Sequence, residues 1–322
     1  MSELAKLPNV GKVLEEHLLA VGIDTPDQLR QVGATEVFQR IRRQRDPGAC
    51  LHMLYGIQGA VMGIPDKLLP PDIKQELKAL FHNLPAEIVP LKKIIVENIP
   101  AVLWGEKSSK LIIAVHGNLS NKLDVPISLL AEVAVPRGYQ VLSFDLPQHG
   151  DRKEEPTLCK VQNCVHDLSR IMNFAAVYSK ELSLFACSMG AYFSLLAYKT
   201  VSLRQSLFLS PVVDMDRIIE NMMKWFEISK ERLQTEQKID TPVGQPLYWD
   251  YYCYVKENPI AVWQSPTAIL YGSADNLCEY EVVSSFANKF GCTLEVVDNG
   301  EHYFHTAAQL AVYRSWLQKN LR

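Results

Sequence analysis

The 322-residue sequence predicts an α/β protein, in which a small all-helical domain precedes a mostly parallel, doubly wound sheet. Three observations support this fold class. Residues 1–83 carry apolar side chains at helical spacing. From residue 93 onward, short apolar strands alternate with helical segments, which is the pattern of a parallel sheet. Between residues 212 and 263 the alternation breaks, and an apolar helical stripe there predicts a helical insert.

Composition narrows the class of protein. An apolar content of 48% and a charged content of 21% are typical of a globular protein with a sizeable core. The net charge of −3 gives no overall attraction to nucleic acid or acidic membranes. The seven cysteines show no metal-ligand spacing, so we expect free thiols and no metal. With neither a signal-peptide pattern nor a membrane-spanning apolar run, the sequence predicts a cytoplasmic protein without membrane contact.

The first domain opens with a helix–hairpin–helix pattern. Pro8 and Gly11 predict a turn, Gly22 ends the following helix, and Asp24 or Thr25 with Pro26 starts the next one. Turn amides at such a helix N-terminus can accept a phosphate. The arginines within residues 40–45 could do the same, but no aromatic residues lie between them, which favours a solvated helix end.

This stretch resembles the C-terminal domain of the TfoX competence regulators. The resemblance implies a role in interaction or regulation for residues 1–83, through contact with a protein or, weakly, with nucleic acid. The residues that carry it are Leu7, Pro8, Asn9, Val10, Gly11, Val21, Gly22, Ile23, Thr25, Leu29, Leu51, Leu54, Tyr55, Gly56 and Ala60.

The remaining elements follow in order along the chain. A helix over 71–83 closes the first domain, and residues 84–92 form a proline-marked linker to the second domain, 93–322. The expected strands are 93–104, as two strands turning near Asn98, then 111–115, 139–144, 182–187, 206–209, 267–271 and 294–297. The expected helices are 126–135, 164–178, 191–198, 280–289 and 305–318.

Ser188 stands at the corner between a buried strand and a helix. The string Ala186-Cys187-Ser188-Met189-Gly190 fits the G-x-S-x-G nucleophile elbow, with Ala in place of the first Gly. In such an elbow the serine Oγ is exposed and the small flanking residues let strand and helix pass closely. The alternative is an ordinary N-cap serine, which the same string also suits.

Three later signals favour the nucleophile. Asp275 follows a strand within Gly272-Ser273-Ala274-Asp275, and His302 lies between the last strand and the last helix. The order Ser, Asp, His is the one that α/β-hydrolases use. Asn118 follows the buried strand 111–115, where an oxyanion-hole N–H originates, and the Met189 N–H is the expected second donor. His305 competes with His302, but we expect it inside the last helix.

Over residues 93–322 the chain resembles the α/β-hydrolase superfamily. The segment Asp145-Leu146-Pro147-Gln148-His149-Gly150 is similar to the D-x-P-G-H-G loop of its esterases and peptidases, with Gln148 in place of a glycine. The resemblance implies a serine hydrolase that acts by acyl transfer through Ser188, His302 and Asp275, without a cofactor. A carboxylic-ester hydrolase is the leading reading, with serine peptidase and thioesterase as neighbours.

The helical insert at 212–263 sits where α/β-hydrolases place a cap, so the resemblance implies a cap insert that walls a pocket for a small acyl substrate. The candidate lining residues are His116, His149, Trp225, Trp249 and Tyr252. The alternative is that these side chains only pack the cap and the loops onto the sheet domain.

A second class of function stays open: a regulatory or scaffold protein, whose helical domain binds a partner or nucleic acid and whose hydrolase domain is a sensor. A dehydrogenase is excluded, because no G-x-G-x-x-G follows the first strand. The oligomeric state is left open.

Overall fold

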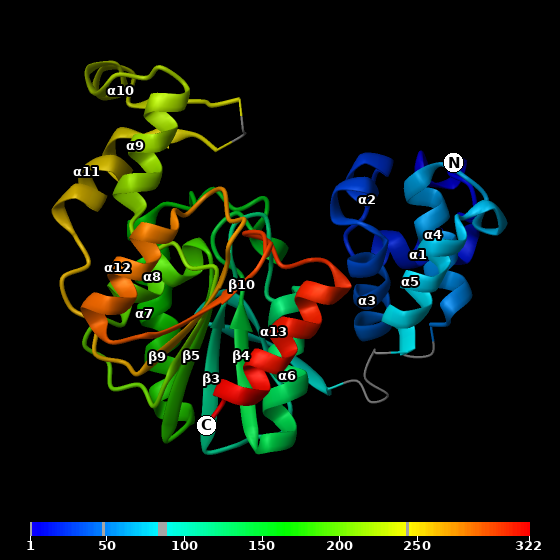
Figure 1. Cartoon of the computed structure of the whole chain (residues 1–322), viewed down its shortest axis with the longest axis horizontal. Coiled ribbons are helices and arrows are strands. Elements are labelled where there is room, and N and C mark those ends of the chain that lie inside the picture. The colour runs from blue at the N-terminus through cyan, green and yellow to red at the C-terminus, as the bar shows by residue number, and fades with distance from the viewer. Residues whose placement is uncertain (1, 47–48, 83–88, 243–244) are drawn as a thin grey trace. The chain divides into compact units, whose positions relative to one another are not determined.

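The computed structural model describes residues 2–46, 49–82, 89–242 and 245–322. The chain divides into two compact units, Met1–Ile88 and Val89–Arg322 (Figure 1). No helix in the described ranges is both long and apolar enough to cross a membrane.

The described part of the first unit is helical, as expected. Thr25 and Gln28 form a capping box that starts α2, and Gly22, with φ +79°, follows α1. Asn9 closes the opening turn onto later elements: its side chain donates to the carbonyl of Ile64 at 3.0 Å and accepts from the Asp66 N–H at 3.0 Å. The elements are η1 (Leu4–Lys6), α1 (Lys12–Ala20), α2 (Pro26–Val32), α3 (Ala34–Gln44), α4 (Leu51–Met62), η2 (Asp66–Leu68) and α5 (Pro71–His82).

The second unit contains an eight-stranded sheet in the order β1-β2-β4-β3-β5-β6-β9-β10. The pairs β1–β2 and β2–β4 are antiparallel, and the other pairs are parallel. The predicted fold class is therefore confirmed. The strands are β1 (Leu91–Val96), β2 (Ile99–Trp104), β3 (Lys110–Val115), β4 (Tyr139–Phe144), β5 (Glu181–Cys187), β6 (Ser206–Leu209), β9 (Thr267–Gly272) and β10 (Thr293–Val297).

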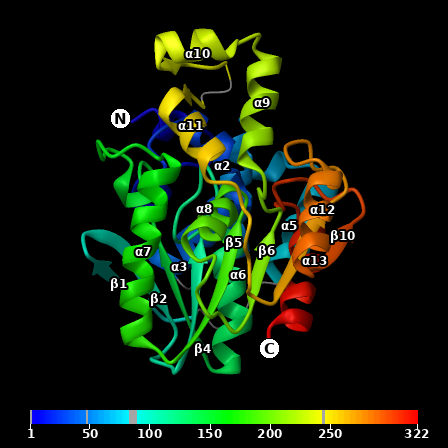
Figure 2. The same cartoon turned by 90° about the vertical axis from the view of Figure 1, so that its left-hand side faces the viewer.

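Helices cover both faces of this sheet. On one face, α7, α8 and α12 bury a core that includes Leu168, Phe193 and Phe286. On the other, α6 and α13 bury a second core that includes Leu130 and Trp316. Figure 2 shows α7 and α8 in front of the strands. The helices and short 3-10 turns are α6 (Val125–Ala134), η3 (Val135–Arg137), η4 (Gly150–Arg152), α7 (Val161–Tyr178), α8 (Met189–Ala197), α12 (Tyr280–Phe290) and α13 (Ala307–Asn320).

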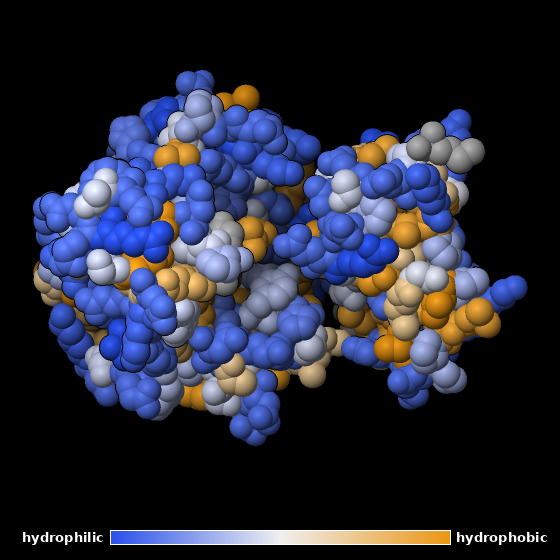
Figure 3. Space-filling view, turned by 90° about the horizontal axis from the view of Figure 1, so that it is seen from above, coloured by the Kyte–Doolittle hydropathy of each residue, from blue (hydrophilic) through white to orange (hydrophobic). Residues whose placement is uncertain are grey.

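The insert between β6 and β9 is helical, as the broken alternation predicts. It forms a cap beyond one end of the strands (Figures 1 and 2). Seen from the cap side, the second unit is mainly hydrophilic, with apolar residues in small separate groups (Figure 3). The insert comprises α9 (Met215–Trp225), α10 (Lys230–Glu236), β7 (Lys238–Ile239), β8 (Leu247–Tyr248) and α11 (Trp249–Glu257).

Several expected boundaries need correction, and α7 begins at Val161 rather than at residue 164. The linker expected at 84–92 lies mostly outside the described residues, and its last two residues belong to β1, because Leu91 and Lys92 pair with Trp104 and Leu103 of β2. The last helix begins at Ala307 rather than at residue 305, because Thr306 caps it by accepting from the Gln309 N–H. His305 therefore lies in the preceding loop.

Candidate active site

Ser188 occupies a strained corner between β5 and α8. Its φ of +48° and ψ of −125° lie outside the regions that non-glycine residues favour. The corner is held by backbone bonds: the Ser188 N–H donates to the carbonyl of Leu209, and the Ser188 carbonyl accepts from Val212. Strain of this kind persists only where surrounding structure fixes it, and it concentrates at functional sites.

Small residues let the corner approach its neighbours. A Cβ on Gly190 would lie 2.3 Å from the carbonyl oxygen of His116, so only glycine fits there. Ala186, which replaces the first glycine of the motif, is fully buried at the end of β5. Burial raises the pKa of the adjacent Cys187 thiol well above its ordinary value, which keeps that thiol protonated.

The structure brings the three predicted side chains into one hydrogen-bonded chain. His302 Nε2 lies 2.8 Å from Ser188 Oγ, and His302 Nδ1 lies 2.7 Å from Asp275 Oδ2. This arrangement suits an imidazole that carries its proton on Nδ1 and accepts the serine hydroxyl proton at Nε2. The side chain of Asp275 is fully buried, whereas that of His302 is 18% exposed, so the chain leads from the interior towards solvent.

The carboxylate of Asp275 is fixed on its other side. Asp275 Oδ1 accepts from the backbone N–H groups of Leu277 and Cys278, each at 2.9 Å. Both oxygens are thus satisfied, which orients the group towards His302. Cys278 also lies close: one ligand atom each from Asp275, Cys278 and His302 fall within 4.8 Å of one another. Burial raises the pKa of the Cys278 thiol, which makes it a poor metal ligand at neutral pH.

Gly272 and Gly300 together bring His302 to the sheet. A Cβ on Gly272, at the end of β9, would lie 2.2 Å from the carbonyl oxygen of Gly300. The Ala274 N–H also donates to that oxygen at 2.8 Å. The loop carrying His302 therefore packs against the end of β9 through bare backbone. The pair of glycines was visible in the sequence, but nothing local indicated that they meet.

One residue of the predicted oxyanion hole, Met189, follows Ser188 directly, and the other, Asn118, follows a residue that packs against Ser188. Gly117, which precedes Asn118, is so close that a Cβ there would lie 3.1 Å from the Cβ of Ser188. Met189 is the first residue of α8. Within the described ranges, neither the Asn118 nor the Met189 backbone N–H has a protein acceptor. The Asn118 side chain donates to Gln245 Oε1 of the cap at 3.1 Å, a contact that sequence reasoning missed.

Two buried histidines support the loop that follows β3. His116 Nδ1 lies 2.7 Å from the Gly117 carbonyl, and its Nε2 accepts from the Leu146 N–H at 3.0 Å, so both ring nitrogens are used. Burial, followed by the proximity of His149, lowers the pKa of His116 to about 3. His149 Nε2 lies 3.2 Å from both the Leu119 N–H and Asn118 Oδ1. These two residues position the loop.

A buried ion pair anchors the same loop. Lys122 is 3% exposed and Asp145 is fully buried, and the Lys122 ammonium contacts the Asp145 carboxylate. The carboxylate also accepts from the backbone N–H groups of Lys122 at 2.9 Å and Asp151 at 2.8 Å. The loops after β3 and β4 are thereby tied together. The sequence offered no clear signal for this pair, because the two residues are far apart along the chain.

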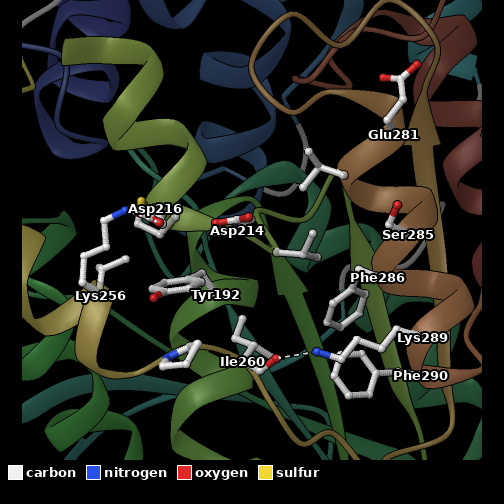
Figure 4. A pocket seen from close by; sticks show the side chains of 15 residues that line it. Tyr192, Asp214, Asp216, Lys256, Ile260, Glu281, Ser285, Phe286, Lys289 and Phe290 are labelled. Carbon is white, nitrogen blue, oxygen red and sulfur yellow. Dashed lines mark hydrogen bonds and ion pairs between the residues drawn. The ribbon is translucent and has the colours of Figure 1, made fainter. Parts of the chain in front are cut away.

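The aromatic pocket candidates are spread over the cap. Trp225 is 56% exposed near the end of α9, and Trp249 stacks on Tyr252 along α11 at a centroid distance of 5.5 Å. Neither these residues nor His116 and His149 line the pocket shown in Figure 4. Their role in binding a substrate stays a prediction.

The pocket in Figure 4 has a volume of about 570 Å³ and lies between α9, α11 and α12. Tyr192, one turn along α8 from Ser188, forms part of its wall, whereas Ser188, Asp275 and His302 do not. Its polar side chains include Lys256, which pairs with Asp216 at 2.8 Å. Its full lining is Tyr192, Val213, Asp214, Met215, Asp216, Val255, Lys256, Pro259, Ile260, Glu281, Val282, Ser285, Phe286, Lys289 and Phe290.

Comparison with solved structures places the second unit among known folds. Est1E from Butyrivibrio proteoclasticus, solved with ferulic acid bound, is 18% identical, with a TM-score of 0.59, over 71% of this chain and 97% of that one. A putative hydrolase from Agrobacterium vitis S4 is 14% identical, with a TM-score of 0.60, over 72% and 99%. Mouse alpha/beta hydrolase domain-containing protein 10 is 14% identical, with a TM-score of 0.58, over 72% and 98%.

Sequence comparison identifies the first unit. Residues 1–81 match the family of the TfoX C-terminal domain. No curated protein matches the sequence. The chain thus joins a TfoX C-terminal domain at residues 1–81 to a second unit with the α/β-hydrolase fold.

Proposed function

We propose that this protein is a serine hydrolase, with a carboxylic ester as substrate and Ser188 as nucleophile. The observation that carries the proposal is the hydrogen-bonded chain from Ser188 Oγ through His302 to Asp275, at 2.8 Å and 2.7 Å. It is supported by the α/β-hydrolase fold and by solved structures of similar fold whose names describe them as hydrolases.

The first half-reaction forms an acyl-enzyme. Ser188 Oγ attacks the carbonyl carbon of the ester while His302 Nε2 takes the hydroxyl proton. Asp275 keeps the Nδ1 proton in place and stabilises the imidazolium that forms. The backbone N–H groups of Asn118 and Met189 donate to the developing oxyanion, a contribution of about 3 kcal/mol for each such donor. His302 then protonates the departing alcohol.

The second half-reaction hydrolyses the acyl-enzyme and regenerates the free enzyme. Water gives a proton to His302 Nε2 and attacks the acyl carbon, and Ser188 Oγ leaves with that proton. All groups needed for this cycle come from the chain itself. A thioester or an amide can enter the same cycle, since only the leaving group differs.

The test is covalent labelling with a fluorophosphonate probe. Wild-type protein is expected to label at Ser188, and Ser188→Ala to lose the label. Ser210→Ala is the matched control, because Ser210 lies just past the end of the neighbouring strand β6, is buried, and has a positive φ of 43°. Equal labelling of wild type and Ser188→Ala would reject Ser188 as the nucleophile. Hydrolysis rates for matched ester, thioester and peptide substrates then identify the leaving group.

We also propose that residues 1–83 serve interaction or regulation, on the basis of the TfoX C-terminal domain match. If the partner is nucleic acid, full-length protein binds duplex DNA with an affinity that falls steeply as salt rises. If the protein causes no mobility shift of the DNA at low salt, a protein partner is the remaining form of this proposal. Retained DNA binding by Ser188→Ala, together with no labelling of the wild type, would favour a regulatory protein over an enzyme.

A further inference from the structure

Two cysteines meet at the start of α7, beside the candidate active site. Cys159 precedes the N-cap residue Lys160, and Cys164 lies in the first turn of α7. These are the positions at which a hydrophobic staple brings two side chains together across a helix N-terminus. Their Sγ atoms are 3.7 Å apart, whereas a disulfide needs about 2.05 Å. A small movement of the two side chains would therefore bring the sulfur atoms within bonding distance.

The two thiols differ in pKa and in exposure to solvent. The hydrogen bond with Cys164, and then the neighbouring His149, lower the pKa of Cys159 to about 6. Burial raises the pKa of Cys164 well above its ordinary value. Cys159 is partly exposed, and Cys164 is buried. A reagent from solvent thus meets a thiolate at Cys159, with a protonated thiol behind it.

The dithiol is connected to the loop that carries the proposed oxyanion donor. The Cys159 N–H donates to Gln148 Oε1 at 3.0 Å, next to His149. Burial lowers the pKa of His149, but its interactions with Cys159 and the Pro147 carbonyl outweigh burial and raise it. His149 in turn lies 3.2 Å from the Leu119 N–H and from Asn118 Oδ1.

The same helix start also contacts the cap. Lys160 Nζ lies 2.8 Å from Asp250 of α11 and 4.2 Å from the centroid of the Tyr248 ring. Gln162 donates to the same carboxylate at 3.1 Å. Forming the bond would remove the hydrogen bond between the Cys159 thiol and His149, and so affect the loop after β3. Lys160, which lies between the two cysteines, would pass any accompanying shift to the cap.

We propose that Cys159 and Cys164 form a peroxide-oxidisable dithiol site, which closes to a disulfide on the border between the active-site loop and the cap. The Cys159 thiolate attacks one peroxide oxygen, the O–O bond breaks, and hydroxide or alkoxide leaves, so that Cys159 becomes a sulfenic acid. Cys164 Sγ then attacks Cys159 Sγ, and the hydroxyl departs as water with the Cys164 proton. The two thiols lose two electrons and the peroxide gains them.

The chain offers a direct readout. Trypsin cleaves after Lys153, Lys160 and Arg170, so Cys159 and Cys164 fall in separate peptides, residues 154–160 and 161–170. Full-length protein treated with stoichiometric hydrogen peroxide and digested without reductant is expected to yield these two peptides joined, with a loss of two hydrogens. Dithiothreitol should separate them.

Single-cysteine variants distinguish the thiol that attacks the peroxide from the thiol that attacks the sulfenic acid. Cys164→Ser is expected to accumulate a dimedone-reactive sulfenic acid at Cys159, and Cys159→Ser to give no product at Cys164. Cys292→Ser is the matched control, because Cys292 is also partly exposed, while burial raises its pKa to about 11. It should leave the joined peptides unchanged. The proposal would be overturned if Cys159 were oxidised no faster than Cys292. It would also be overturned if the disulfide-linked product did not contain both peptides.

The effect on hydrolysis rests on the proposed function. Peroxide-treated wild type is expected to lose at least about tenfold in kcat/KM, a change of roughly 1.4 kcal/mol in transition-state stabilisation, and to regain it with dithiothreitol. Cys159→Ser should show neither change. A protein that forms the joined peptides but hydrolyses nothing, before or after reduction, would refute the enzyme proposal and leave the dithiol site standing. Unchanged kcat/KM in fully joined protein would refute the link between the two sites.

Discussion

Replacing Gly272 with alanine tests whether the close approach of two backbone segments positions His302. The new Cβ would lie 2.2 Å from the Gly300 oxygen, 2.4 Å from the Gly300 carbonyl carbon and 2.8 Å from the Glu301 oxygen. All three are backbone atoms, so no flexible side chain can move aside. Real Cβ atoms essentially never approach closer than 3.0 Å, so the loop must shift by at least about 0.8 Å.

The magnitude follows from the position of the loop. His302 lies two residues beyond Gly300, and its Nε2 is 2.8 Å from Ser188 Oγ. A shift of about 0.8 Å along that direction would lengthen the contact to roughly 3.6 Å, which is no longer a hydrogen bond. Misplacement of a catalytic group by about 1 Å costs on the order of 100-fold in rate. Overpacking should also lower the free energy of unfolding by about 1–3 kcal/mol.

The assay compares kcat/KM for an activated ester and the rate of fluorophosphonate labelling, with urea unfolding to measure stability. Gly291→Ala is the matched control: Gly291 has φ +64° and nothing within 4 Å of a new Cβ. It should cost about 1–2 kcal/mol of stability from the left-handed backbone alone and leave the labelling rate unchanged. A folded Gly272→Ala protein that labels at the wild-type rate would refute the reasoning.

Three further predictions concern the same unit. Asp275→Asn should lower kcat by about 10⁴-fold without unfolding the protein, because an amide facing Nδ1 selects the wrong imidazole tautomer; an ester assay with circular dichroism checks it, and a rate near that of wild type contradicts it. His116 binds its proton with a pKa of about 3 when folded and 6.5 when unfolded, so protonation of the unfolded state should remove up to about 1.4 kcal/mol of stability per pH unit as the pH falls from 6.5 towards 3. Urea unfolding between pH 5 and 6.5 should show a shallower pH slope for His116→Gln than for wild type, and equal slopes would exclude His116 as the source. Lys122→Met leaves the Asp145 carboxylate buried without its counter-charge and should destabilise the protein by about 3–5 kcal/mol; thermal unfolding measures it, with Lys238→Met, which removes an exposed pair with Asp240, as the near-neutral control.

The sequence by itself determined the local features. Alternating strands and helices specified the mostly parallel sheet, and the bounds of β4 and β6 match the expected ones. The glycine after α1 and a helix start at Asp24 or Thr25 could be predicted because these signals lie within a few residues of the helix ends, and the structure places the cap at Thr25. Ser188 could be placed at its corner for the same reason, since strand, serine and helix are contiguous in the chain.

Tertiary structure alone decided how those features meet. The order β4-β3-β5 depends on register between distant strands, which no local window contains. The distance from His302 to Ser188 depends on Gly272 and Gly300 packing as bare backbone, and the loop after β3 depends on Lys122 reaching Asp145. Propensities and caps act over a few residues, whereas these contacts are fixed only when the whole sheet has formed.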